Sequence, residues 1–180
     1  MSFLSRFFTS HSKVKTELFK TPPPPTDAEI RNAEISLKLK FPDTFIAFMR
    51  NSRELNLPLC AQFYWVGDDS LGTVNIVSAN FAERNASGSR APDFFVAFYN
   101  DGMGNQVCFD TRRPNSNGEY PIVFWDHELD ADENLAKSDR PAINRENVGC
   151  IANSFPDWWK TEHAALTSST AATKSVTSSL

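Results

Sequence analysis

The segment from Phe94 to Glu128 constrains the fold of this chain more than any other part of its sequence. It contains three runs of aromatic and β-branched residues, Phe94–Tyr99, Val107–Thr111 and Ile122–Trp125, separated by polar stretches rich in Gly, Asn and Pro. Runs of this kind, bounded by turn-forming residues, are typical of β-strands joined by short connections. We therefore expect a three-stranded meander.

The two breaks in this segment have the composition of connectors. The first places Gly102 and Gly104 where a reversing chain needs positive φ, so a hairpin with a short loop is expected. The second contains Pro114, which has no amide proton to donate to a central ladder. Because the run Phe94–Tyr99 is apolar almost throughout, we expect it to form a central strand that is covered on both faces.

The order of these parts resembles the SUKH superfamily of the Smi/Knr type. Its members show an apolar strand, a glycine-rich hairpin, a strand ending in Asp, a variable loop, and a strand followed by Asp-His-Glu. Here the middle strand reaches Asp110, and the last is followed by Asp126, His127 and Glu128. With its flanking helices the resemblance covers residues 26–166. It implies an α+β domain, with helices packed on a mainly antiparallel sheet of about five to six strands.

The same resemblance implies a function in protein binding. Many bacterial members are immunity proteins that neutralise a cognate toxin, often a nuclease or a deaminase, by direct binding. Other members resemble intracellular scaffold or regulatory proteins in signalling and cell-wall control, and this role is the alternative. Both roles imply a protein partner, and neither implies an enzyme.

Charge is distributed unevenly along the 180 residues. The formal net charge of the chain is −4, whereas Met1–Lys20 carries four basic residues and one acidic residue, so the remainder carries −7. An acidic body suits a basic protein partner and argues against nucleic acid, because phosphates select Lys and Arg. Ordinary solubility is the alternative explanation of such a modest charge.

Carboxylates are dense in two places, and we hypothesise that together they form a surface that faces the toxin. Its residues are Asp68, Asp69, Asp126, Glu128, Asp130, Asp132 and Glu133. His127 lies among them, and Asp110 is a candidate partner for its ring. Consecutive strand residues point to opposite faces, so the Asp-His-Glu sequence favours a strand end whose His bonds to the backbone over a metal or acid–base site.

The sequence offers no other chemistry. Gly102 and Gly104 lack the third glycine of a phosphate-binding loop, and a strand follows them where that loop needs a helix. The three cysteines are widely spaced and form no C-x-x-C pair, which argues against a zinc site or a disulfide framework. We therefore expect no catalytic residue, no cofactor and no metal.

Three parts are expected along the chain. Residues 1–25 form an N-terminal arm and spacer, residues 26–166 the domain, and residues 167–180 a disordered tail rich in Ser and Thr. Within the arm, apolar residues near helical spacing predict an amphipathic helix over Met1–Lys20, which docks on the domain or on a partner. Thr21–Pro25 is expected to be a polyproline II spacer. No apolar run is long enough to span a membrane, and no signal peptide is recognised, so the cytoplasm is the default location.

The remaining elements follow from local signals. Thr26 and Glu29 form a capping box that begins a helix with Ile30, Ala33 and Leu37 on its buried face. Pro42 opens a second helix, Asp43–Arg50.

Two further strands and two further helices are expected. The strands are Phe63–Val66 and Thr73–Val77, and a short helix capped by Asn80 follows them. The last helix is capped by Asn153 or Ser154, and its Trp158–Trp159 pair is expected to lie in the core and at the core's rim.

Overall fold

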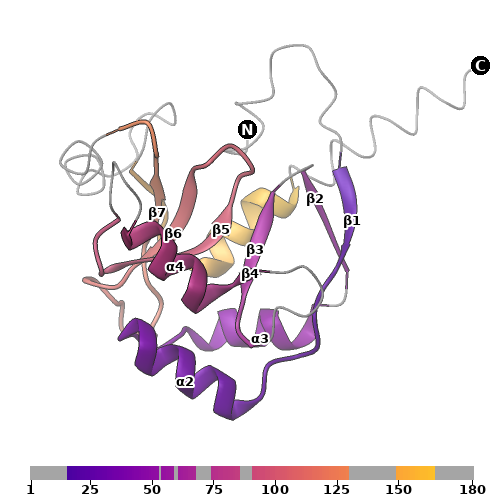
Figure 1. The fold of residues 1–180 in the computed structure, drawn as a ribbon, viewed down its shortest axis with the longest axis horizontal. Coiled ribbons are helices and arrows are strands. Elements are labelled where there is room, and N and C mark those ends of the chain that lie inside the picture. The colour runs from indigo at the N-terminus through magenta and orange to yellow at the C-terminus, as the bar shows by residue number, and fades with distance from the viewer. Residues whose placement is uncertain are drawn as a thin grey trace, which may run out of the picture.

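A computed structural model describes residues 16–52, 54–58, 61–67, 74–85, 91–129 and 149–164 (Figure 1). Its centre is a six-stranded sheet with the order β4-β3-β5-β6-β7-β8, in which only the β3–β4 pair is parallel. The strands are β3 (Gln62–Trp65), β4 (Val74–Asn75), β5 (Phe95–Asn100), β6 (Gln106–Asp110), β7 (Ile122–Trp125) and β8 (Cys150–Ala152). The α+β class and the mainly antiparallel sheet are thus confirmed.

The predicted meander is strands β5, β6 and β7. Strand β5 lies between β3 and β6, and its first five residues are buried, as expected of a central strand. The hairpin between β5 and β6 turns through Gly102 and Gly104, whose φ angles are 83° and 99°. Only glycine adopts such angles without steric cost, so the two glycines define the turn.

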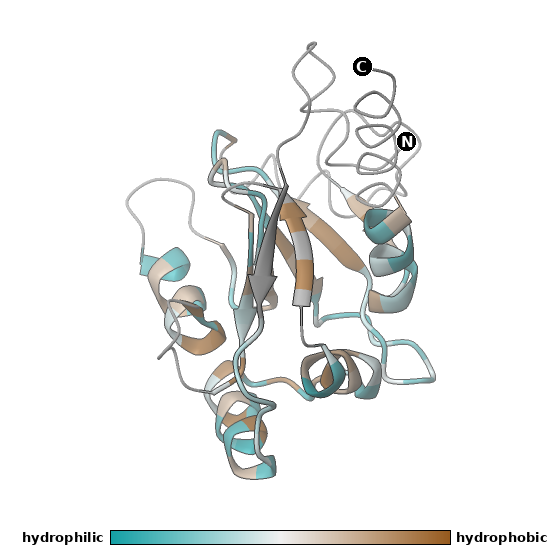
Figure 2. Cartoon of the chain, turned by 90° about the vertical axis from the view of Figure 1, so that its right-hand side faces the viewer, coloured by the Kyte–Doolittle hydropathy of each residue, from teal (hydrophilic) through white to brown (hydrophobic). Residues whose placement is uncertain are grey.

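Helices cover both faces of the sheet (Figures 1 and 2). Helix α4 (Ile76–Asn85) packs on one face, where it contacts β5. Helix α3 (Asp43–Asn51) and the C-terminal helix, residues 155–164, bring their aromatic residues to the other face. Helix α2 (Asp27–Leu37) lies beside α4.

The core on the α3 face is a cluster of aromatic rings. Phe98 of β5 lies 4.4 Å from Phe109 of β6, measured between ring centroids, and 5.0 Å from Trp158 of the C-terminal helix. Phe45 of α3 lies 5.1 Å from Phe109 and 5.2 Å from Phe155. These contacts fix the positions of two helices relative to the sheet, because edge-to-face aromatic pairs favour a defined geometry.

Helix α2 begins as predicted. The Thr26 hydroxyl accepts a hydrogen bond from the backbone N–H of Glu29 at 3.2 Å, and a carboxylate oxygen of Glu29 accepts from the N–H of Thr26 at 2.7 Å. The predicted stripe of Ile30, Ala33 and Leu37 is buried. The helix ends at Leu37, and Lys38 follows in the left-handed region with φ 58°.

The elements between β3 and β5 differ from the prediction. Strand β4 contains only two residues, and helix α4 already begins at Ile76. Its first turn is capped by Asn75, whose side-chain oxygen accepts hydrogen bonds from Val77 N at 2.8 Å and Ser78 N at 3.2 Å. The expectation that Asn80 caps this helix is therefore wrong.

Asn80 is instead a buried link between α4 and β5. Its amide donates to Ala97 O and accepts from Ala97 N, both at 2.8 Å. Strand β3 pairs with β5 only at Tyr99 and Asn100. Ala97 lies beyond the end of this pairing, and the Asn80 side chain binds its N–H and C=O groups in place of a strand. Sequence reasoning assigned Asn80 to a cap because Asn favours caps, whereas this tertiary contact uses it inside a helix.

The end of the N-terminal arm also differs from the prediction. Thr16–Lys20 is strand β1, which pairs antiparallel with β2 (Glu54–Pro58) in a separate two-stranded sheet. The amphipathic helix predicted over Met1–Lys20 is therefore wrong for residues 16–20, and residues 1–15 lie outside the described part. Leu55 and Leu57 of β2 are buried, so this ribbon contributes to the core.

The proline run is attached to the domain. Pro22 and Pro25 are buried, and the Thr21 hydroxyl donates to Ser52 O at 2.8 Å. The boundary near residue 25 stays a prediction, as does the tail, which lies outside the described residues. Within the described ranges, no helix combines the length and apolar character that crossing a bilayer would need.

Candidate protein-binding site

The hairpin between β5 and β6 meets the end of β7 at one end of the sheet. Gln106, the first residue of β6, is paired with Trp125, the last residue of β7. The Asp-His-Glu sequence that follows Trp125 therefore lies beside the hairpin loop. We call this region the hairpin-end site; its residues are Glu83, Asp101, Asn105, Gln106, Asp126, His127 and Glu128.

The hairpin loop is held by the buried carboxylate of Asp101. One of its oxygens accepts from Met103 N at 2.8 Å and from Asn105 N at 3.2 Å. The other oxygen accepts from the side-chain amide of Asn105 at 2.8 Å. Hydrogen bonds to a charged acceptor are stronger than neutral ones, so these three bonds stabilise the conformation of the loop.

Asn105 in turn fixes His127. Its side-chain oxygen lies 3.3 Å from the donating backbone N–H of His127 and 2.9 Å from ring Nδ1. Because that oxygen only accepts, Nδ1 carries the proton, and in the neutral ring Nε2 is left as an acceptor. We predicted that the His127 ring bonds to the backbone. In the structure it bonds to the side chain of Asn105 instead.

The close approach of His127 explains the second glycine of the hairpin. A Cβ atom on Gly104 would lie 3.0 Å from ring atoms of His127. That distance is below ordinary van der Waals contact, and φ at Gly104 is 99°. The backbone conformation therefore favours glycine here, and any larger residue would also need the His127 ring to shift.

Asp110 is not the partner of His127. It lies at the opposite end of β6, fully buried, and accepts hydrogen bonds from Arg112 Nη2 at 2.9 Å and Arg113 Nη2 at 2.6 Å. The Arg112 guanidinium also lies 4.5 Å from the ring centroid of Phe94. Burial by itself would raise the pKa of Asp110, but the hydrogen bonds from the two arginines outweigh it, and the pKa is lowered.

Glu83 of α4 brings a further carboxylate to the hairpin-end site. Its Oε1 accepts from Gln106 Nε2 at 3.0 Å, and the oxygen of the same Gln106 amide accepts from the Tyr64 hydroxyl at 2.9 Å. Burial raises the pKa of Glu83, although His127 opposes this shift. Burial, supported by Glu83, also raises the pKa of Tyr64 to about 12. Carboxylates with raised pKa values are enriched at functional sites.

The structure brings together only part of the predicted acidic surface. Asp126 is half-buried and Glu128 is exposed, and Asp126 Oδ1 accepts from the backbone N–H of Glu128 at 2.9 Å. Five members lie outside the described residues: Asp68, Asp69, Asp130, Asp132 and Glu133.

The segment that leads to Asp68 is described, and it lies elsewhere. Gly67 follows the end of β3 that lies opposite Gln62. It is close to α2, because a Cβ atom on Gly67 would lie 3.0 Å from a carboxylate oxygen of Glu29. Gln62 is paired with Asn100, next to the hairpin. Gly67 and Asp126 therefore lie at opposite ends of the sheet.

Sequence reasoning missed Glu83, Asn105 and Gln106. A signal for two of them was present, because Asn105 and Gln106 are polar residues directly between a glycine turn and an apolar strand. No local signal marks Glu83, which reaches the site only because α4 packs on the sheet.

The chemistry of the site is that of oriented polar groups. Among the described residues, no group of three His, Cys, Asp or Glu is arranged to hold a metal ion. A nucleophile–base pair needs a hydroxyl or thiol within reach of the base, whereas the hydrogen bond of the His127 ring goes to the Asn105 amide oxygen. The hydrogen bonds among Asp101, Asn105 and His127 set the orientation of the His127 ring and the conformation of the hairpin loop.

A comparison with family models matches residues 24–160 to the SMI1 / KNR4 family (SUKH-1). The chain belongs to this family. The match covers the whole six-stranded sheet and the hairpin-end site, while β1 lies before it. Membership in the SMI1 / KNR4 family suggests a protein-binding domain of the immunity type. A comparison with curated proteins gave no match.

Proposed function

We propose that this SMI1 / KNR4 family protein is an immunity protein that neutralises a cognate bacterial toxin in the cytoplasm by binding it directly. The observation that carries the proposal is the set of three carboxylates, Glu83, Asp126 and Glu128, at one rigid end of the sheet. A basic substrate-binding cleft, such as that of a nuclease or a deaminase acting on nucleic acid, is the complementary surface.

The raised pKa of Glu83 supports a binding role for this carboxylate. Partial burial disfavours its charged form, so Glu83 lowers stability at neutral pH relative to an uncharged residue of the same shape. A Gln at this position would keep an oxygen that accepts from Gln106. A charged residue that the fold itself does not favour is explained by a cationic partner.

Rigidity supports the same proposal. The Asp101–Asn105–His127 hydrogen bonds hold the hairpin loop, and Asp126 holds the backbone of Glu128. Preorganised groups lose little conformational entropy on association, which raises affinity for a given contact area. Carboxylates placed in this way accelerate encounter with a basic partner and select against acidic ones.

The proposed surface still includes the seven carboxylates predicted from the sequence, in two groups. By sequence position, one group follows β7 and contains Asp126, Glu128, Asp130, Asp132 and Glu133, and the other follows Gly67 and contains Asp68 and Asp69. Neutralising each group separately tells which of them faces the toxin.

The experiment combines growth rescue with association kinetics. The full chain is co-expressed with each toxin candidate encoded beside its gene, and a toxin that it rescues is purified in an inactive form. Glu83→Gln with Asp126→Asn and Glu128→Gln is expected to slow association about tenfold or more at low salt. The control is Asp27→Asn with Asp43→Asn and Asp157→Asn, which changes the charge equally on three other elements.

The outcomes are distinct. If the chain rescues growth from none of these toxins, the immunity function is contradicted. Rescue with unchanged association of the triple variant would place the interface away from the hairpin end. A scaffold or regulatory role is the alternative. A free arm for tethering would favour that role, but the described part of the arm is paired with β2 through β1.

A further inference from the structure

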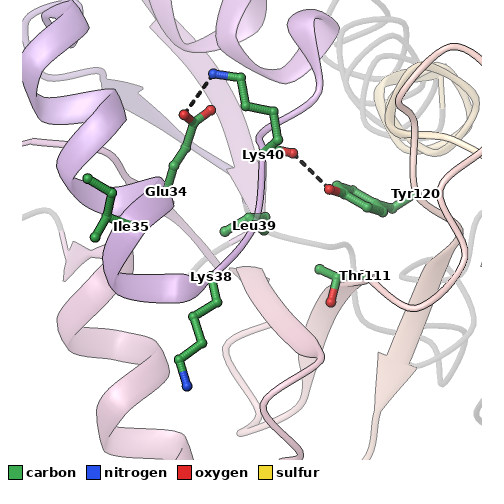
Figure 3. Close-up of a pocket in the computed structure, with 7 residues that line it drawn as sticks. All are labelled: Glu34, Ile35, Lys38, Leu39, Lys40, Thr111 and Tyr120. Carbon is green, nitrogen blue, oxygen red and sulfur yellow. Dashed lines mark hydrogen bonds and ion pairs between the residues drawn. The ribbon is translucent and has the colours of Figure 1, made fainter.

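A pocket of about 540 Å³ lies between the end of α2 and the end of β6, away from the hairpin-end site (Figure 3). Its lining differs from the acidic body of the chain, because it contains two lysines and one carboxylate. The lining residues are Glu34, Ile35, Lys38, Leu39, Lys40, Thr111 and Tyr120. We call it the α2 pocket.

The α2 pocket presents apolar surface to solvent. Ile35 is 76% exposed, and half-buried Leu39, four positions further along the chain, also lines the pocket. A single exposed Ile is ordinary on a protein surface. An exposed Ile at the edge of a pocket, with a second apolar side chain inside, can receive an apolar side chain from a partner.

Lys38 supplies an unneutralised positive charge. Among the described residues it is the only non-glycine residue with positive φ, and its ammonium has no hydrogen-bond or ion-pair partner there. Glycine is the usual residue at this place after a helix, because L-residues are disfavoured in the left-handed region. The fold therefore gains nothing evident from a lysine here.

The chain that carries these lysines is held in a fixed conformation. The Glu34 carboxylate accepts from Phe41 N at 3.0 Å and from Lys40 Nζ at 2.8 Å. The Tyr120 hydroxyl donates to Lys40 O at 3.0 Å, as Figure 3 shows. Lys40 is 78% exposed in spite of its ion pair, so its charge remains available to a second carboxylate.

The positive charge of the α2 pocket comes from Lys38 and Lys40. Arg112 and Arg113, which follow Thr111, are both engaged with the buried carboxylate of Asp110. The carboxylates of the hairpin end act weakly here, because salt screens charges over about 8 Å at physiological ionic strength.

We propose that the α2 pocket is a docking site for an acidic segment of a partner protein. An apolar side chain of the segment lies on Ile35 and Leu39, and its flanking carboxylates pair with Lys38 and Lys40. Charge complementarity selects this occupant, because a basic segment would meet Lys38 and Lys40. The site is separate from the acidic surface of the proposed function, so either can fail without the other.

The test measures fluorescence anisotropy of a short labelled peptide in which a central Leu is flanked by Asp and Glu residues. The full-length chain is expected to bind this peptide, and to ignore the same peptide with Lys in place of the acids. Ile35→Asp and Lys38→Glu are each expected to weaken binding about tenfold or more. Phe81→Asp and Lys160→Glu, at exposed positions on α4 and the C-terminal helix, are the matched controls and should bind normally.

Lys38→Gly separates binding from structure. Glycine is favoured at φ 58°, so this variant should melt at the same temperature as the natural chain or above it, and yet bind the peptide more weakly. No binding of the acidic peptide at low salt, or equal binding by Ile35→Asp, Lys38→Gly and the controls, would overturn the proposal. Self-association of the chain that Ile35→Asp abolishes would also overturn it, by assigning the pocket to a second copy.

Discussion

One carboxylate oxygen of Glu119 accepts a hydrogen bond from the backbone N–H of Phe155 at 3.1 Å, across 36 positions of the sequence. The other oxygen accepts from the Thr44 hydroxyl in the first turn of α3. A single buried carboxylate thus binds the N-terminal ends of two helices, where partial positive charge from the peptide dipoles favours an anion. The loop between β6 and β7 is thereby connected to both helices of the aromatic face.

Glu119→Ala should lower the free energy of unfolding by about 1 to 3 kcal/mol, because it leaves the buried N–H of Phe155 without its acceptor and removes the bond from the Thr44 hydroxyl. Glu119→Gln should cost less, since its amide oxygen can still accept from Phe155. Urea unfolding measures both. Glu128→Ala, at an exposed carboxylate, is the control and should change stability by less than about 0.5 kcal/mol. An equal effect of Glu119→Ala and Glu128→Ala would contradict the role given to Glu119.

Phe98→Ala should destabilise the domain by about 3 to 5 kcal/mol, because it removes a fully buried ring from the centre of the aromatic cluster. Thermal or urea unfolding monitored by Trp fluorescence gives the value. Phe81→Ala, the same substitution at a half-exposed ring of α4, is the matched control and should have a much smaller effect. A negligible change in the free energy of unfolding on Phe98→Ala would contradict the placement of Phe98 in the core.

Asn80→Asp should destabilise by at least about 1 to 3 kcal/mol, because the carboxylate can still accept from Ala97 N but has no proton to donate to Ala97 O. The matched control is Asn85→Asp in the last turn of the same helix, at an exposed position. Asn80→Ala removes the acceptor as well, so hydrogen exchange of the Ala97 amide should accelerate in this variant and stay unchanged in Asn85→Ala. Unaltered exchange at Ala97 would show that the link between α4 and β5 is unimportant.

Stability should fall in acid partly through Asp110. Its pKa in the folded chain is lowered from the ordinary value of 3.8, so the folded state holds this proton less tightly than the unfolded state. The resulting stabilisation is present above about pH 4 and is lost as the pH falls through the lowered pKa. Asp110→Asn should therefore be less stable than the natural chain at pH 7, and the difference should shrink below pH 4. A difference that stays constant from pH 7 to pH 2 would contradict the pairing with Arg112 and Arg113.

Much of the fold could be predicted from local signals. The three meander strands, the positive φ of Gly102 and Gly104, and the capping box at Thr26 were each predicted from residues close together in the chain. Predictions were wrong where a distant partner overrides a local preference. Asn80 favours a cap but bonds to β5, and residues 16–20 have a helical pattern but pair with β2.

The sequence by itself determined the family, the strands of the meander and the places where the chain turns, because alternation, apolar runs and turn residues act over a few positions. Only the tertiary structure decided which polar groups meet. Asn105 reaches His127 across 22 positions, Glu83 reaches Gln106 across 23, and the α2 pocket forms between segments about 70 positions apart. The physical reason is that a hydrogen bond or an ion pair depends on distances of a few ångströms in space, and these are set by how α4, α2 and the sheet pack together.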